Sequence, residues 1–345
     1  MDALADLLDG VRARTAAFCR TVLEPPWALR IVDEAPLALA IPLRGNAWLV
    51  PDEGEPVLIQ AGDIAIVKGP DHYTVGDRPG TRPEFTVHAG NRVTAADGTD
   101  ITDAERLSPF TTAFGPTVGG DVSARGDASA VESPEATVIA SGTYQVAGDV
   151  SGRLLAALPP MVRVPRDTVQ SPVMDLLAEE VRRDAPGQQV VLDRLLDLAL
   201  IAALRAWFDR PAAEPPGWYR AQGDPVVGRG LRAVHGRPAE PWTVNALAAE
   251  SGVSRAAFAR RFADLVGQPP MTYLTGYRID MAADLLRDSD ATVEAIARRV
   301  GYANAFALSV AFKRERGITP RQHRARDSAG PSPISTSRSL DRSSR

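Results

Sequence analysis

The stretch GVSRAAFARRF, residues Gly252–Phe262, decides how the C-terminal part of the chain is interpreted. Ser254 stands just before a run with helical periodicity, and its hydroxyl can accept a hydrogen bond from a first-turn amide. At 100° per residue, Phe258, Phe262 and Leu265 share one face, which must be core. The opposite face is small and basic, with Ala256, Ala259, Arg260 and Ala263. The stretch therefore fits either a helix that lies in a DNA groove or an ordinary surface helix.

A diverged second copy of this stretch, GYANAFALSVAF, occupies Gly301–Phe312. The copies match at an offset of 49 residues up to the turn glycine and 50 residues from the capping residue onward. Asn304 takes the capping position of Ser254. Two helices joined by a turn that contains glycine form the helix-turn-helix pattern, so the sequence predicts two such units. A helical bundle without a role in DNA binding is the alternative, and the repeated spacing together with positive charge disfavours it.

The second copy differs in what it exposes. Leu308 and Phe312 face inward, and the outward positions are Phe306, Ser309, Val310 and Lys313. Apolar Phe306 and Val310 are unusual on a solvated helix face. They fit either contact with thymine methyl groups or packing on another part of the protein.

The connector PMTYLTGYRIDMAADLLRDS, Pro270–Ser289, is predicted to form one helix. Its apolar stripe consists of Tyr273, Leu274, Tyr277, Met281, Leu285 and Leu286. About 17 helical residues span roughly 25 Å, which would hold the two recognition helices about one DNA turn, or roughly 34 Å, apart. One chain could then read two successive major grooves.

Charge is distributed unevenly along this 345-residue chain of net charge -4. Residues 1–224 hold 20 lysines and arginines against 32 aspartates and glutamates, whereas residues 225–327 hold 16 against 10. A basic C-terminal part behind an acidic front indicates a polyanionic partner. Chance clustering is the alternative that charge alone leaves open.

Residues from about Trp242 to Arg324 resemble the DNA-binding domain of the AraC/XylS family of transcription regulators. The matching stretches are LAAESGVSRAAFARRFADLVGQPPMTYLTGYRIDMAADLL and IARRVGYANAFALSVAFKRERGITPRQHR. The resemblance implies two helix-turn-helix units joined by a long helix. It implies base-reading roles for Arg255, Ala256, Ala259, Arg260, Ala305, Phe306, Ser309 and Val310, and phosphate contacts for Lys313 and Arg314.

The chain departs from that family in the second unit. Family members usually carry an aromatic residue at the place of Leu308 and a basic residue at the place of Val310. The second unit is therefore expected either to bind mainly through the DNA backbone or to prefer T-rich sequence.

Short apolar or alternating runs between Trp27 and about Val146, separated by Gly, Pro, Asn and Asp, predict many short strands. This pattern favours a barrel or a sandwich. A long loop is expected over Thr111–Pro134. The stretches PWALRI, LRGNAWLV and IQAGDIAIVKGPDHYTV resemble the cupin-type sensor domain of one branch of AraC-like regulators. The resemblance implies a small antiparallel β-barrel followed by linker and dimerisation helices.

The expected fold class is therefore multidomain α+β, with a cupin-like antiparallel β-barrel, linker and dimerisation helices, and an all-α double helix-turn-helix. The expected divisions are residues 1–165, 166–222, 223–327 and a disordered tail at 328–345. The helix predicted over Gln188–Arg210 is apolar almost all round, so it must be buried within the chain or against a partner.

The barrel lacks the pattern of a metal-dependent cupin enzyme, which needs a His-x-His pair, a carboxylate and a further histidine. The chain has four histidines and no His-x-His. We therefore expect no enzyme activity, no catalytic metal and no cofactor. His72 lies where cupins often place a last ligand, and His88 lies in the stretch FTVHAGN. A weak metal or small-ligand role for these two histidines, or an ordinary structural place, both stay open.

Cys19 is the sole cysteine, so an intrachain disulfide is excluded. Nearby Arg14 and Arg20 would lower the pKa of its thiol, and in the resembling branch a cysteine recurs before the PW element. The resemblance thus implies sensing of oxidants or electrophiles, and an inert buried thiol is the alternative. The N-terminus lacks the positive charge of a signal peptide, and the apolar run Leu195–Phe208 is too short to span a membrane. A cytoplasmic location and no membrane contact are expected.

The sequence as a whole predicts a DNA-binding transcription regulator that responds to a small-molecule or oxidant effector through its cupin-like domain. The expected partners are double-stranded promoter DNA and a second copy in a homodimer, with RNA polymerase as a further candidate. The competing hypothesis is a cupin-like enzyme or small-molecule-binding protein whose DNA-binding domain has degenerated.

Overall fold

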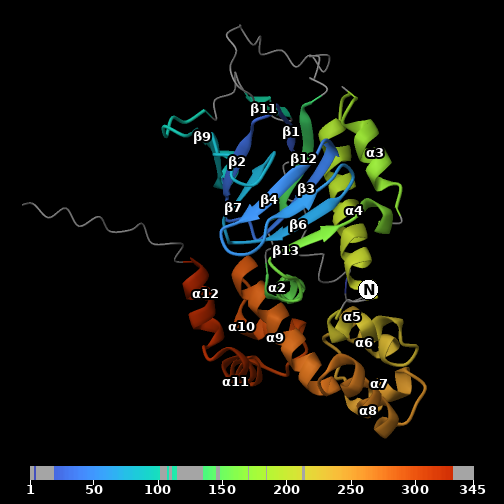
Figure 1. The fold of residues 1–345 in the computed structure, drawn as a ribbon. Helices are drawn as coiled ribbons and strands as arrows, with labels where there is room; N and C mark the ends of the chain where they lie inside the picture. The colour runs from blue at the N-terminus through green and yellow to red at the C-terminus, as the bar shows by residue number, and fades with distance from the viewer. Residues whose placement is uncertain are drawn as a thin grey trace, which may run out of the picture. The chain divides into compact units, whose positions relative to one another are not determined.

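The fold is that of a computed structural model, and the residues that it describes are 4, 19–101, 107–108, 111–114, 135–144, 148–169, 171–183, 185–211 and 214–328. The chain forms two compact units, one built mainly from residues up to Tyr219 and one mainly from Arg220 onward. Figure 1 shows that the strands lie in the first unit and that the second is helical. The predicted class, multidomain α+β, is confirmed.

The strands of the first unit form two sheets. One has the order β10 (Leu107–Ser108), β11 (Thr111–Phe114), β1 (Cys19–Leu23), β12 (Thr137–Tyr144), β3 (Leu37–Arg44), β6 (Ile64–Lys68) and β13 (Met161–Val164). The other has the order β5 (Val57–Ile59), β4 (Ala47–Pro51), β7 (Tyr73–Gly76), β2 (Ala28–Val32), β8 (Phe85–His88) and β9 (Val93–Ala95).

Three details differ from the expected barrel. The described strands are divided between two sheets rather than closed into one, and the four edge strands have at most four residues each, which limits edge-to-edge pairing. The pairs β1–β11 and β2–β8 are parallel. Thr111–Phe114, expected to be part of a loop, forms β11 because its backbone pairs with Arg20–Leu23 of β1. The rest of the expected loop, up to Pro134, lies outside the described residues.

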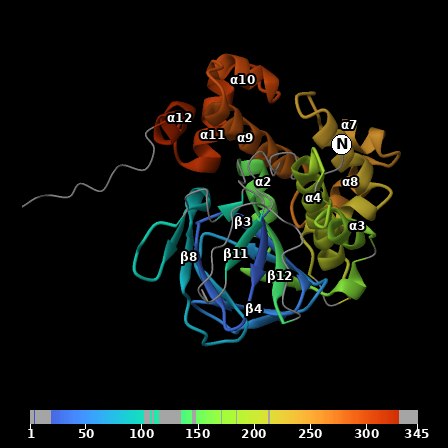
Figure 2. The same ribbon diagram turned by 90° about the horizontal axis from the view of Figure 1, so that it is seen from above.

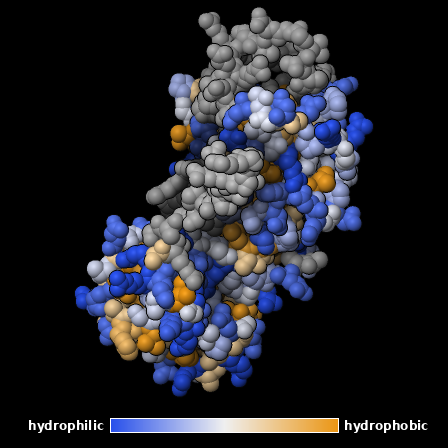
Figure 3. Space-filling view, turned by 90° about the vertical axis from the view of Figure 1, so that its left-hand side faces the viewer, coloured by the Kyte–Doolittle hydropathy of each residue, from blue (hydrophilic) through white to orange (hydrophobic). Residues whose placement is uncertain are grey.

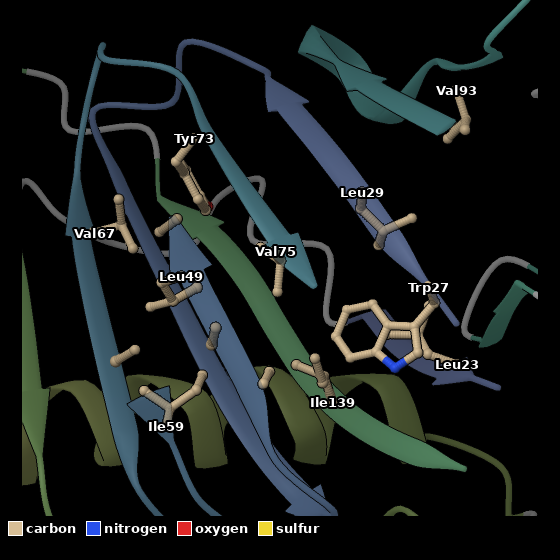
Figure 4. Close-up of a cluster of buried hydrophobic side chains, with 14 residues drawn as sticks. Leu23, Trp27, Leu29, Leu49, Ile59, Val67, Tyr73, Val75, Val93 and Ile139 are labelled. Carbon is tan, nitrogen blue, oxygen red and sulfur yellow. The ribbon is translucent and has the colours of Figure 1, made fainter. Parts of the chain in front are cut away.

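The core of the first unit lies where the inner faces of both sheets meet. Leu23 and Ile139 come from the first sheet, and Leu29, Leu49 and Val75 come from the second (Figure 4). Figure 2 shows strands of both sheets from above. Such packing follows from the period of two residues per strand, which puts alternate side chains on the inner face.

Two helices of the linker region cover the outer face of the first sheet. They are α3 (Val173–Glu180) and α4 (Gln188–Phe208), which pack on each other, and α4 also packs on β6 and β13. As predicted, α4 buries much of its apolar surface, through Leu192, Leu196, Ala199, Leu200, Ala203, Leu204 and Phe208. Its Val190, Val191 and Leu198 remain exposed.

Shorter elements complete the unit and the connection. They are the α-helices α2 (Asp149–Ala156) and α5 (Gly217–Arg220) and the 3₁₀-helices η1 (Ala89–Asn91), η2 (Arg166–Thr168) and η3 (Ala221–Gly223). No helix within the described part of the chain combines the length and apolar character needed to cross a lipid bilayer.

The second unit contains α6 (Val227–Gly236), α7 (Val244–Glu250), α8 (Arg255–Val266), α9 (Pro270–Asp288), α10 (Val293–Arg299), α11 (Ala305–Arg316) and α12 (Pro320–Ser328). The predicted connector helix is α9, whose 19 residues span about 28 Å at 1.5 Å per residue. Apart from Ser328, the tail that was expected to be disordered lies outside the described residues.

Each half of the helical unit has its own core. In the first half, Phe258 and Phe262 are fully buried, with ring centroids 5.6 Å apart, and Phe262 lies 5.8 Å from the Tyr273 ring of α9. In the second half, Leu308 and Phe312 of α11 are fully buried and pack against residues of α9 and α10. The inward faces predicted from helical geometry are therefore confirmed.

Gly230 of α6 is needed for the close approach of α6 to α8. A Cβ atom built on Gly230 would lie 2.6 Å from Cζ of Phe258, well inside van der Waals contact. The absence of a side chain here lets the first helix-turn-helix pack tightly.

Candidate nucleic-acid interface

The first recognition helix, α8, begins and ends as its sequence predicts. Gly252 in the preceding turn adopts a φ of +73°, a conformation that residues with a side chain rarely take. The Ser254 hydroxyl accepts a hydrogen bond from the Ala257 amide at 3.3 Å. Gly267 ends the helix in the left-handed conformation. The turn and cap fix the direction in which α8 projects.

α8 carries four of the eight residues that are expected to read bases. Arg255, Ala256 and Arg260 are exposed, and Ala259 is half-buried. Arg255 and Arg260 have no hydrogen-bond or ion-pair partner in the described part of the chain, so both guanidinium groups are available to a ligand.

Arg261 is different, although it is adjacent to Arg260 and is also exposed. Its Nη2 and Nε atoms donate to one carboxylate oxygen of Asp224, at 2.6 and 2.9 Å. Burial alone would raise the pKa of Asp224, but hydrogen bonds from Arg261 and from the Val226 and Val227 amides outweigh it and hold that pKa below its usual value. Arg261 thus ties α8 to the segment before α6. No local sequence pattern indicates this pair, because its members lie 37 residues apart.

The second recognition helix, α11, has a similar start. The Asn304 side chain accepts from the Ala307 amide at 2.9 Å, and Gly301 in the turn has a φ of +83°. A further contact has no counterpart in the repeat. The Ala305 amide donates to Glu294 of α10 at 2.7 Å, and this bond, with a second one from Arg298, lowers the pKa of Glu294.

The outward face of α11 is apolar where that of α8 is basic. Phe306 keeps 78% of its surface exposed and Val310 keeps 53%. Ala305 and Ser309 beside them are half-buried, and Lys313 is exposed. Within the helical unit neither Phe306 nor Val310 is packed away, so the face is open to a partner.

The two expected phosphate contacts also differ from each other. Lys313 has no hydrogen-bond or ion-pair partner among the described residues. Arg314 pairs with its neighbour Glu315, its Nη2 lying 3.0 Å from the carboxylate, and its side chain is 65% exposed. Exposed pairs of this kind contribute little free energy, about 0–1 kcal/mol, so Arg314 can exchange Glu315 for a phosphate.

Removing either helix cap is expected to lower the free energy of unfolding of the helical unit by about 1 kcal/mol, because a first-turn amide loses its acceptor. Ser254→Ala and Asn304→Ala should each speed hydrogen exchange at the capped amides, Ala257 and Ala307, as read by mass spectrometry. Ser309→Ala is the matched control, because it removes a hydroxyl in the middle of α11, away from the capping position. Equal exchange in all three variants would contradict the capping role.

The candidate sensor residues lie in the first unit. His88 is hydrogen-bonded through Nε2 to the Thr94 hydroxyl at 2.9 Å. His72 is half-buried. Cys19 begins β1 opposite Ser141 of β12, and its side chain lies outside what the structure describes. The described residues contain no group of three or more His, Cys, Asp or Glu residues placed to hold a metal ion.

Two capped recognition helices joined through a long central helix, each with an open outward face, define a DNA-binding protein of the double helix-turn-helix class. Comparison with known families agrees with this. Residues 247–326 match the family model described as a helix-turn-helix domain, and residues 2–209 match the model described as a cupin.

Relatives of similar length match this chain over nearly its whole length. A putative AraC-like transcription regulator of Streptomyces lividans is 30% identical over 332 residues, covering 94% of this chain and 98% of that protein. Another from Streptomyces antibioticus is 31% identical over 334 residues, with the same coverage. The solved DNA-binding domain of AdpA, in complex with a target DNA, is 34% identical and covers 31% of this chain and 96% of that chain, with a TM-score of 0.30. The chain belongs to the AraC-like family of transcription regulators and carries a cupin-type N-terminal domain.

Proposed function

We propose that this regulator binds promoter DNA by placing α8 and α11 in two successive major grooves, under the control of its cupin-type domain. The observation that carries the proposal is the length of α9, whose 19 residues span about 28 Å and connect the two helix-turn-helix units. Successive major grooves on one face of DNA are about 34 Å apart.

The proposed division of contacts follows exposure and pairing. Arg260, exposed and unpaired in the middle of α8, is assigned a base contact, with guanine O6 and N7 as the acceptors that a guanidinium fits best. Arg255 at the start of the helix is assigned a second base or phosphate contact. Lys313 and Arg314 are assigned phosphate contacts near the end of α11.

A homodimer is proposed through the linker helices. Val190, Val191 and Leu198 on α4 and Leu176 on α3 are large apolar side chains that the first unit leaves exposed. Their burial against a second copy would remove this surface from water. The dimer would bring together four recognition helices, and RNA polymerase is a further proposed partner at the promoter.

The signal is proposed to be a small molecule or an oxidant that acts on the cupin-type domain and shifts the protein between states of different DNA affinity. Cys19, His72 and His88 are the candidates for contact with that signal. No enzyme activity is proposed, because the relatives of similar length are named as transcription regulators.

The full-length protein is expected to bind its promoter sites about 10³-fold or more tightly than random DNA at physiological salt. The affinity should fall steeply with salt, with a log–log slope near -0.9 for each phosphate neutralised. Sites mapped across the genome supply the fragments, and fluorescence anisotropy gives the dissociation constants. Equal affinity for mapped and random fragments would contradict the proposal and favour a small-molecule-binding protein with a degenerate DNA-binding unit.

A further inference from the structure

The exposed apolar pair of α11 has a defined place on the helical unit. Phe306 and Val310 are four residues apart, which puts them on one face one turn from each other. They retain 78% and 53% of their surface. Figure 3 shows hydrophobic patches among the mostly hydrophilic residues on one face of the molecule. A single exposed apolar residue is ordinary, but a pair on one face of a recognition helix has to be explained.

The repeat shows which positions this pair occupies. With the offset of 50 residues, Phe306 corresponds to Ala256 of α8 and Val310 corresponds to Arg260. Both α8 positions are exposed on the face assigned to DNA. The apolar pair therefore lies at the centre of the corresponding face of α11, where a groove-bound helix meets base edges.

The neighbouring charge matches DNA as the partner of this face. Lys313, three residues after Val310, is exposed and has no hydrogen-bond or ion-pair partner in the described chain. Arg314 follows it in an exposed pair that is easily exchanged. Cations one turn beyond an apolar pair are placed to meet the phosphates that border a major groove.

The chemistry of the two side chains restricts what they can recognise. Phe306 and Val310 have no side-chain donor or acceptor, so they cannot read the hydrogen-bonding edges of guanine, adenine or cytosine. The one apolar group that a base pair presents in the major groove is the C5-methyl of thymine.

We infer that α11 reads thymine through its C5-methyl group, with Phe306 and Val310 as the specificity-determining residues of the second half-site. The inference rests on the proposed function, in which α11 enters a major groove. The two units then read DNA by different chemistry, since α8 uses guanidinium hydrogen bonds and α11 uses apolar contact with methyl groups.

The test replaces each thymine of a mapped site, one at a time, by uracil, which lacks only the methyl group. Full-length protein should bind about three- to fivefold more weakly at one or more positions, the effect expected for one buried methyl group. The double variant Phe306→Ala with Val310→Ala should bind the thymine and uracil probes at those positions equally. Lys313→Ala is the matched control. It should weaken binding to the thymine probe and to the uracil probe by the same factor, so that the ratio of their dissociation constants is unchanged.

Three results would overturn the inference. One is equal binding of all thymine and uracil probes by the unaltered protein. Another is a thymine preference that persists in the double variant. The third is a double variant that binds every probe normally but fails to regulate a reporter, which would assign the pair to a protein partner. Failure of the proposed function is distinct, because the unaltered protein would then not prefer the mapped site over random DNA.

Discussion

Arg260→Ala is expected to weaken binding to a mapped site by about 1–3 kcal/mol and to relax base preference at the position that Arg260 contacts. Arg260 is exposed at the centre of the outward face of α8, where no described group of the protein competes for its guanidinium. A bidentate contact with guanine would be lost entirely with the side chain. Dissociation constants for the mapped site and for its single-base variants measure both effects.

Arg261→Ala is the matched control, because it removes the same charge from the adjacent position. The Arg261 guanidinium is already bound by Asp224 at 2.6 Å, so its loss should leave the ratio of specific to random binding unchanged. Val310→Ala should also weaken binding much less than Arg260→Ala. If Arg260→Ala and Val310→Ala had equal effects on affinity and specificity, the roles assigned to the two units would be wrong.

Phe262→Ala is expected to lower the free energy of unfolding of the first helix-turn-helix by about 3–5 kcal/mol. The Phe262 ring is fully buried between Phe258 and Tyr273, so truncation leaves a cavity that the surrounding helices cannot fill. Hydrogen exchange of α8 and α9 in the full-length protein reports this unit separately from the cupin-type domain. Protection in both helices should fall together.

Phe306→Ala makes the same chemical change at an exposed position and serves as the control. Its effect on the free energy of unfolding should stay within about 0.5 kcal/mol, because Phe306 contributes little to the core. Comparable losses of protection in the two variants would mean that the inward and outward faces have been confused. Loss of protection only with Phe262→Ala supports the assignment.

The helical unit could be predicted in detail because its information is local and occurs twice. A glycine in each turn, a capping side chain after it and core residues four apart fix a two-helix unit without long-range contacts. The structure confirms both caps and both buried pairs, Phe258 with Phe262 and Leu308 with Phe312. The contacts with DNA assigned to the outward residues stay predictions, since they depend on a partner.

Long-range pairing is what the sequence could not supply. Helical geometry places Arg260 on the outward face, but the partner of the adjacent Arg261 depends on the position of Asp224 in the folded unit. Glu294 has no counterpart in the first unit, where Asn245 stands at its place, so the repeat could not indicate its bond to Ala305.

The same reason explains the outcome for the cupin-type domain. Alternation of apolar residues predicts strands, but their division between two sheets depends on pairings between distant segments, such as β1 with β12 and β11. Thr111–Phe114 falls within the predicted loop because the stretch up to Pro134 is rich in Gly, Ala, Ser and Thr. Its parallel pairing with β1 decides its structure.

The most direct test of the central claim is a base-interference footprint of the full-length protein on a mapped promoter site. If α8 and α11 occupy successive major grooves, the required bases will form two clusters on one face of the duplex, about 10–10.5 base pairs apart from centre to centre. A single cluster, or protection without any required base, would contradict the reading of DNA by two recognition helices.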